Sequence, residues 1–123
     1  MTARSVQFYG EEVIKAEKTL REVCAALQIS RRTIQGYEKA GLVSPSGKNK
    51  YGYLLYNPTA QKRIQTIHFY QQLGFSIKEI QTIADASRER QKAALVNRIS
   101  VLETKQIQLR HLIQQAKQYI AAL

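Results

Sequence analysis

The chain has 123 residues, of which 19 are Lys or Arg and 9 are Asp or Glu, so its formal net charge is +10. This length accommodates one globular domain and one appended element, which disfavours an enzyme with a catalytic cleft between two lobes. The strong positive charge indicates a polyanion as partner, and an apolar content of 44% argues against a disordered basic tail. Composition therefore predicts a small, soluble, basic protein of the cytoplasm.

Several classes of site and location are disfavoured by the residues that the chain lacks. The single cysteine, Cys24, excludes an internal disulfide framework and a thiolate zinc cluster. No apolar run approaches the roughly 20 residues that cross a bilayer, and no signal-peptide stretch follows Arg4. His68 and His111 are isolated, and no catalytic grouping or phosphate-binding glycine loop is present. We therefore expect no enzyme, no cofactor, no metal and no membrane partner.

Two short helices are predicted between residues 19 and 41. Thr19 and Glu22 have the spacing of a capping box, and apolar residues recur at helical spacing up to Leu27. Ser30 is a suitable N-cap for the second helix, which Gly41 ends as a left-handed C-cap. Two helices joined by so tight a turn form a helix-turn-helix pattern.

The next segment predicts a β-hairpin and two more helices. Residues 51–56 suit a strand, and the polar residues 46–50 suit the turn of a hairpin, so residues 42–56 are interpreted as a basic wing. Asn57-Pro58 restarts a helix, with Asn as N-cap and Pro at the first helical position. A second capping box, at residues 76–79, opens a short helix.

The last segment, residues 87–123, has neither proline nor glycine and repeats apolar residues in steps of four and three. Such heptads describe a coiled-coil seam. A domain this small cannot cover the stripe, so we expect a second copy of the chain to do so. The predicted dimerisation residues are Leu95, Ile99, Leu102, Gln106, Leu109, Ile113, Ala116 and Ile120, in line with Leu123 at the end.

The helix-turn-helix and the wing carry the candidate contacts to DNA. Arg and Gln read guanine and adenine edges in the major groove, and Lys positions the protein on phosphates. A tyrosine hydroxyl beside basic residues also donates to phosphate oxygens. An ordinary solvated surface is the alternative for such a face. The candidate DNA-binding residues are Arg31, Arg32, Thr33, Gln35, Tyr37, Lys39, Lys48, Asn49, Lys50 and Tyr53.

The sequence resembles the MerR family of bacterial transcription regulators. The resemblance covers about residues 19–123 and is carried by residues 30–38 (SRRTIQGYE), 41–45 (GLVSP), 51–56 (YGYLLY) and 73–80 (LGFSIKEI). It implies a homodimer joined by an antiparallel coiled coil and bound to a pseudo-palindromic operator. It also implies that the dimer distorts the promoter DNA so that RNA polymerase can engage.

Three departures from the family pattern stand out. Gln35-Gly36 replaces the usual Arg-Tyr, and Leu54 replaces the usual wing arginine. Two alternatives follow: the phosphate grip is weaker, or it is made up by Arg31, Arg32, Lys48 and Lys50. Gly36 in a helix interior costs about 1 kcal/mol relative to Ala, which indicates a close approach or a tolerated weakness. Up to Leu123 there are neither the cysteines of metal-sensing members nor an appended ligand domain. We therefore expect no identifiable effector site.

The predicted architecture is mainly α: an N-terminal extension (1–18), a winged helix-turn-helix DNA-binding domain (19–86) and a dimerisation helix (87–123). The predicted function is a dimeric, sequence-specific regulator that binds double-stranded DNA. Two alternatives stay open. One is an architectural, nucleoid or excisionase-like DNA-binding protein, and the other is an adaptor whose coiled coil engages a different protein.

Overall fold

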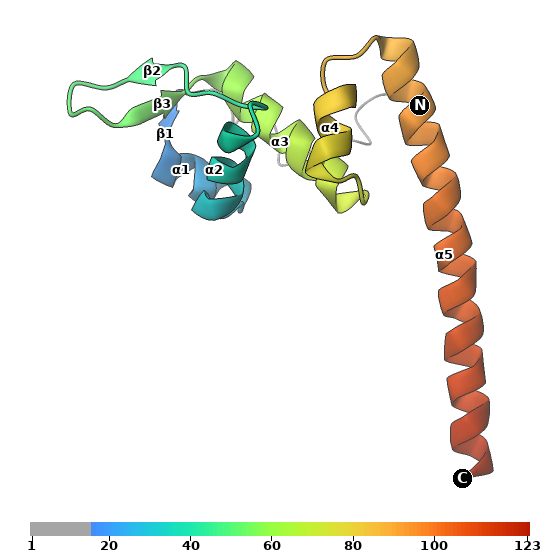
Figure 1. The fold of residues 1–123 in the computed structure, drawn as a ribbon. Helices are drawn as coiled ribbons and strands as arrows, with labels where there is room; N and C mark the ends of the chain where they lie inside the picture. The colour runs from blue at the N-terminus through green and yellow to red at the C-terminus, as the bar shows by residue number, and fades with distance from the viewer. Residues whose placement is uncertain (1–15) are drawn as a thin grey trace. The chain divides into compact units, whose positions relative to one another are not determined.

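A computed structural model describes residues 16–123 as a mainly helical protein with one small sheet (Figure 1). The elements are β1 (Lys18–Thr19), α1 (Leu20–Leu27), α2 (Arg31–Lys39), β2 (Gly47–Lys48), β3 (Leu54–Tyr56), α3 (Pro58–Gln72), α4 (Ile77–Ile83) and α5 (Arg88–Ala122). They fall into two compact units, which meet in the sequence at Ala84 and Asp85. The expected winged helix-turn-helix followed by a long helix is confirmed. Most of the expected N-terminal extension lies outside the described residues.

The predicted caps set the starts of the helices. The backbone N–H of Glu22 donates to the Thr19 hydroxyl at 3.3 Å, and the N–H of Thr19 donates to the Glu22 carboxylate at 2.8 Å. Ser76 and Glu79 form a second capping box, and Asn57 caps α3 by accepting from the N–H of Ala60 at 2.9 Å. Each cap satisfies backbone N–H groups that have no partner within the helix.

Residues in the left-handed backbone region end the first two helices. Gln28 has φ 57° after α1, and Gly41 has φ 76° after α2. The turn at Gln28 lies between α1 and α2, which pack against each other. The predicted end of α2 at a left-handed glycine is confirmed.

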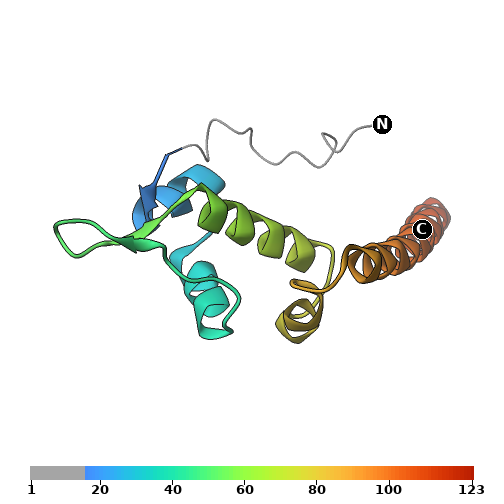
Figure 2. The same cartoon turned by 90° about the horizontal axis from the view of Figure 1, so that it is seen from above.

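The sheet has three antiparallel strands in the order β1-β3-β2. Strand β1, which we did not predict, pairs Lys18 with Tyr56 and Thr19 with Leu55. Two residues carry too little pattern to show a strand, and this pairing joins segments far apart in the sequence. In both Figure 1 and Figure 2 the β2–β3 hairpin projects from the helices as a wing.

The predicted turn of the wing is wrong by several residues. Gly47 and Lys48 pair with β3, and the turn is formed by residues 49–53 instead of 46–50. The side-chain oxygen of Asn49 accepts from the N–H groups of Tyr51 at 2.9 Å and Tyr53 at 3.0 Å. Gly52 supplies the positive φ of 84°. The turn therefore forms where an Asn and a Gly meet its geometric requirements.

The core of the first unit is apolar and lies between the sheet and the helices. Helix α3 packs on β3 and α4, and α1 packs on β1, β3 and α2. Burying each such aliphatic side chain contributes about 1.5–3 kcal/mol, so this cluster holds the short elements together. The largest apolar side chains that are almost fully buried are Val23, Leu27, Ile34, Tyr37, Tyr56, Ile64, Ile67 and Ile80.

A buried hydroxyl links the sheet to the helix-turn-helix. The ring of Tyr56 is fully buried, and its hydroxyl donates to the carboxylate of Glu38 on α2. Burial and this hydrogen bond raise the pKa of Tyr56 above its usual value. The bond therefore holds the last strand of the wing against α2.

We predict that Tyr56→Phe lowers the free energy of unfolding by about 1.5–3 kcal/mol, because it removes a hydrogen bond to a charged group. Urea denaturation followed by circular dichroism measures the change. Tyr53→Phe is the matched control, since Tyr53 is 64% exposed in the same hairpin. Equal stability of the two variants would contradict a stabilising Tyr56–Glu38 bond.

Candidate nucleic-acid interface

Helix α2 has one buried face and one exposed basic face. Ile34 and Tyr37 are 0% and 1% exposed and pack into the core. Positions 31, 35 and 39 are four apart and therefore point away from the core together, with position 32 beside them. The exposed side chains of this face are Arg31, Arg32, Gln35 and Lys39. Four donors of the types that contact bases and phosphates are thus presented to solvent.

Thr33 belongs to the cap of α2. Its backbone N–H donates to the Ser30 hydroxyl at 3.1 Å, and the two hydroxyls are 2.8 Å apart. The side chain is half-buried. Thr33 therefore helps to hold the start of α2, next to the exposed arginines.

The structure contradicts the expected role of Tyr37 as a phosphate contact. Its side chain is in the core, and its hydroxyl donates to the side-chain oxygen of Gln71 on α3 at 2.8 Å. Burial raises the pKa of Tyr37 to about 12. The sequence interpretation failed because basic neighbours along the chain do not show which way a helical side chain points.

The wing presents the second group of basic side chains. Lys48 and Lys50 are exposed, and the Lys50 ammonium lies 5.2 Å from the centre of the Tyr51 ring. Tyr51 is 71% exposed and Tyr53 64% exposed. Exposed aromatic side chains next to cations suit contacts to nucleic acid. Tyr51 was not among the candidate residues, although it directly follows Lys50 in the sequence and belongs to the same predicted strand as Tyr53.

Asn49 has a structural task within the wing. Its side-chain oxygen accepts two backbone hydrogen bonds of the turn, and its backbone N–H donates to the carbonyl of Tyr53 at 2.9 Å. The expected contact to DNA would have to use the remaining amide N–H groups of the side chain. Leu54, where the family resemblance implies an arginine, is half-buried in β3.

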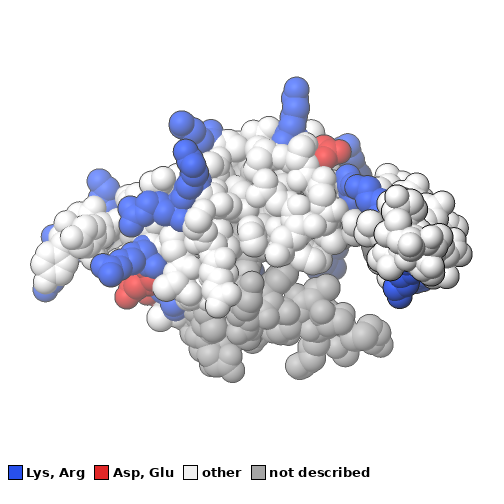
Figure 3. All heavy atoms as spheres, turned by 90° about the horizontal axis from the view of Figure 1, so that it is seen from below, with Lys and Arg blue, Asp and Glu red and all other residues white. Residues whose placement is uncertain are grey.

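Basic side chains dominate the surface around these elements. Figure 3 shows Lys and Arg side chains standing clear of the surface around the wing, at the left, and over the neighbouring helices, with few acidic ones among them. Such a concentration of positive charge attracts a polyanion over distances of about a Debye length, roughly 8–10 Å in physiological salt.

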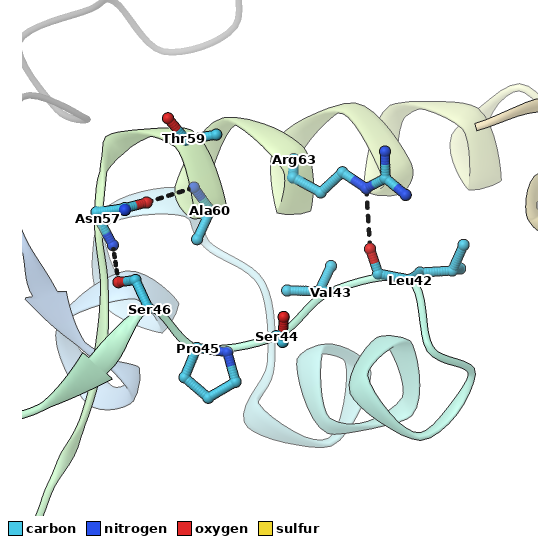
Figure 4. A pocket seen from close by; sticks show the side chains of 9 residues that line it. All are labelled: Leu42, Val43, Ser44, Pro45, Ser46, Asn57, Thr59, Ala60 and Arg63. Atoms are coloured by element: carbon cyan, nitrogen blue, oxygen red, sulfur yellow. Dashed lines mark hydrogen bonds between the residues drawn. The ribbon is translucent and has the colours of Figure 1, made fainter. Parts of the chain in front are cut away.

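An open hollow separates the chain after α2 from the start of α3 (Figure 4). Its volume is about 360 Å³. Arg63 closes one end by donating from Nε to the carbonyl of Leu42 at 2.9 Å, and the N–H of Asn57 donates to the Ser46 hydroxyl at 2.8 Å. These bonds connect α3 to the segment between α2 and the wing. They therefore restrain where the wing lies relative to α2.

Burial changes the pKa of two reactive side chains outside this interface, Cys24 and His68. Cys24 is half-buried, and burial raises the pKa of its thiol, which disfavours the reactive thiolate. Burial lowers the pKa of His68. Among residues 16–123 no group of three or more His, Cys, Asp or Glu side chains could hold a metal. In the same range no helix has the length and hydropathy to cross a membrane.

The predicted seam lies on α5, whose residues are mostly exposed. Ile99 is 50%, Leu109 59% and Ile120 67% exposed, and Leu95 is half-buried. A helix whose large apolar side chains are this exposed presents a surface for another helix.

The comparisons with known proteins agree with this geometry. The family model described as "MerR HTH family regulatory protein" matches residues 18–87. The chain belongs to the MerR family. A second model, described as "MerR, DNA binding", matches residues 61–123. Together the two models extend over the helix-turn-helix, the wing and α5.

Two curated transcriptional activators are similar to this chain at about 30% identity. It is 30% identical over 95 residues to the transcriptional activator Mta of Bacillus subtilis, and 31% identical over 64 residues to the activator TipA of Streptomyces coelicolor. These matches include 77% and 52% of this chain. The chain spans 37% of the length of Mta and 25% of TipA.

Solved structures of the MerR family share the fold. The N-terminal part of the Bacillus subtilis multidrug transporter activator, MtaN, aligns with a TM-score of 0.66 at 28% identity, over 84% of this chain and 97% of that one. HiNmlR, a MerR family regulator that lacks the sensor domain and is bound to promoter DNA, aligns with a TM-score of 0.69 over 85% of this chain and 88% of that one. At 19% identity the second likeness concerns the fold alone.

Gly36 has no packing reason within the described part of this MerR-family chain. It is exposed on α2, and a Cβ built there meets no heavy atom within 4 Å. Gly36 was expected either to allow a close approach or to be a tolerated weakness of the helix. Since no described residue lies close to it, any close approach must come from another molecule such as DNA.

We predict that Gly36→Ala raises the free energy of unfolding by about 0.5–1 kcal/mol, because alanine is the better helix former. If DNA backbone approaches this point of α2, the same variant binds DNA more weakly. Denaturation and a DNA titration measure the two effects separately. Unchanged affinity would show that Gly36 is a tolerated weakness of the helix.

Proposed function

We propose that the chain is a sequence-specific DNA-binding transcription regulator of the MerR type, acting in the cytoplasm and without catalytic activity. The observation that carries this proposal is the exposed basic face of α2 next to a basic wing. Base edges distinguish sequences in the major groove, which admits an α-helix, whereas phosphate contacts set orientation. Family membership and the fold shared with a promoter-bound regulator support the same function.

Within the interface we assign reading and positioning to different residues. Arg31, Arg32 and Gln35 read base edges, because they share the outer face of α2. Lys39, Lys48 and Lys50 hold phosphates on either side. Thr33 supports the start of α2 and Asn49 supports the turn of the wing, and both also contact DNA. Tyr37 is buried and is not part of the interface. Tyr51 joins Tyr53 as an aromatic contact of the wing.

We further propose that residues 87–123 are the dimerisation segment and residues 19–86 the DNA-binding domain. The exposed apolar side chains of α5 support this division, since a second copy would cover them. Two copies of the DNA-binding domain would recognise a pseudo-palindromic operator, whose symmetry mirrors that of a dimer. At a promoter, the bound dimer would act on RNA polymerase through the shape of the DNA.

We predict that Arg31→Ala combined with Arg32→Ala reduces affinity for an operator selected from random duplex DNA roughly 30-fold or more, because each base contact contributes about 1–3 kcal/mol. Fluorescence anisotropy at several salt concentrations measures affinity and its salt dependence. The matched control, Arg88→Ala with Arg90→Ala, removes the same charge from α5 and should cost much less. Equal losses in both pairs would contradict α2 as the recognition helix.

We predict that Leu102→Lys combined with Leu109→Lys produces monomers, because charge in an apolar seam cannot be desolvated without a partner. Multi-angle light scattering measures the mass. Ser100→Lys with Gln114→Lys places the same charges on the opposite side of α5 and should leave the dimer intact. A dimer that survives the first pair of substitutions would argue for a different interface.

A further inference from the structure

We propose that Gln81 on α4 is a positioning residue of the DNA interface, which sets the tilt of α2 by holding the backbone at its end. The side-chain Nε2 of Gln81 donates to the carbonyl of Ala40 at 2.8 Å. This inference rests on the proposed function, because it concerns how α2 is presented to DNA. It adds a residue from α4 to an interface that otherwise consists of α2 and the wing.

The carbonyl of Ala40 is a group that α2 cannot satisfy by itself. The last carbonyls of a helix have no N–H partner within that helix. The turn after α2 provides for one of them, since the N–H of Gly41 donates to the carbonyl of Glu38 at 3.0 Å. Ala40 is the C-cap of α2, and its carbonyl accepts from the side chain of Gln81. The end of α2 is therefore bonded to a different helix.

The residues that follow α2 are held by two side chains from neighbouring helices. Arg63 of α3 donates from Nε to the carbonyl of Leu42 at 2.9 Å, and Gln81 of α4 donates to Ala40. Helices α3 and α4 pack against each other. In Figure 2, α2 (teal) and α4 (olive) lie on the same side of α3 (green). The packed pair α3–α4 therefore fixes residues 40–42, where α2 ends and the path to the wing begins.

A bond at the end of α2 controls where the side chains at its start lie. The buried Ile34 and Tyr37 hold the middle of the helix in the core and act as the pivot. Arg31 precedes Ala40 by nine residues, which corresponds to about 13.5 Å along the axis. Arg31 and Ala40 are equally far from the pivot, so a shift of about 1 Å at one end moves the other end by a similar distance. Recognition sites require positions within about 0.5 Å.

The expected consequence of losing this bond is poorer discrimination between DNA sequences. Base-edge contacts from Arg31 and Gln35 depend on where α2 lies in the groove. Lysine side chains reach phosphates from a range of positions, because their stems are flexible. Gln81 is neutral, so removing its amide leaves the charge of the interface unchanged. Affinity for the operator should therefore fall, whereas the salt dependence of binding should stay the same.

Two variants that remove the bond in different ways test the proposal. Gln81→Met keeps the length of the side chain but has no donor, and Gln81→Asn keeps the amide but is one methylene shorter. Each should lower affinity for an operator selected from random duplex DNA roughly threefold to tenfold, as expected for the loss of one hydrogen bond. Affinity for an unrelated duplex should not change. Fluorescence anisotropy with both duplexes at several salt concentrations measures these quantities.

Gln72→Met is the matched control, because Gln72 is exposed at the end of α3 and undergoes the same chemical change. This variant should bind both duplexes as the unmodified chain does. Circular dichroism during urea denaturation shows that each variant is folded under the conditions of the titration. Unchanged operator affinity in both Gln81 variants would overturn the proposal, and so would a loss confined to Gln81→Met. An equal loss on both duplexes would also overturn it, because it would indicate a direct contact between Gln81 and phosphate.

The same titrations separate failure of this inference from failure of the proposed function. If the unmodified chain and both Gln81 variants discriminate equally between operator and unrelated duplex, the proposed function stands and the role of Gln81 is refuted. If the unmodified chain itself binds the two duplexes equally, the proposed sequence-specific function is contradicted, and the inference fails with it.

Discussion

The burial of one face of α2 is the constraint on which the proposed interface depends. Ile34 and Tyr37 anchor this face, and the Tyr37 hydroxyl donates to Gln71 on α3. Because neither side chain can turn outward without losing its core contacts, the opposite face is held towards solvent. Arg31 and Arg32 are therefore presented by a short helix of nine residues, Arg31–Lys39, that would not be stable by itself.

The wing is fixed to this helix by contacts at its base. Tyr56 at the end of β3 donates to Glu38, and Arg63 donates to the carbonyl of Leu42 after α2. Strand β1 covers the other edge of β3, so that the short hairpin is part of a three-stranded sheet. A two-stranded hairpin alone is marginal in water. These contacts explain how five wing residues, 49–53, are held at a defined place beside α2.

Helix α5 follows a different logic, because its apolar stripe is exposed in a single chain and is covered by a second copy only in the proposed dimer. Large side chains such as Leu109 and Ile113 are more than half exposed. In the proposed dimer, this stripe joins two copies of the chain, so that two DNA-binding domains are presented to a symmetric operator.

By itself, the sequence determined the helices and their ends, the heptads of α5 and the basic character of the interface. Caps such as Thr19 with Glu22 act within one turn of helix, so they can be predicted from the sequence without knowledge of the fold. Tertiary structure decided the pairing of Lys18 with Tyr56, the turn of the wing at Asn49 and the burial of Tyr37. The first and the last depend on contacts between segments distant in the sequence. The turn of the wing depends on which of two adjacent stretches, residues 46–50 or 49–53, forms the more stable turn. The free energy of a contact across the core depends on residues far apart in the sequence, so a local sequence pattern cannot predict it.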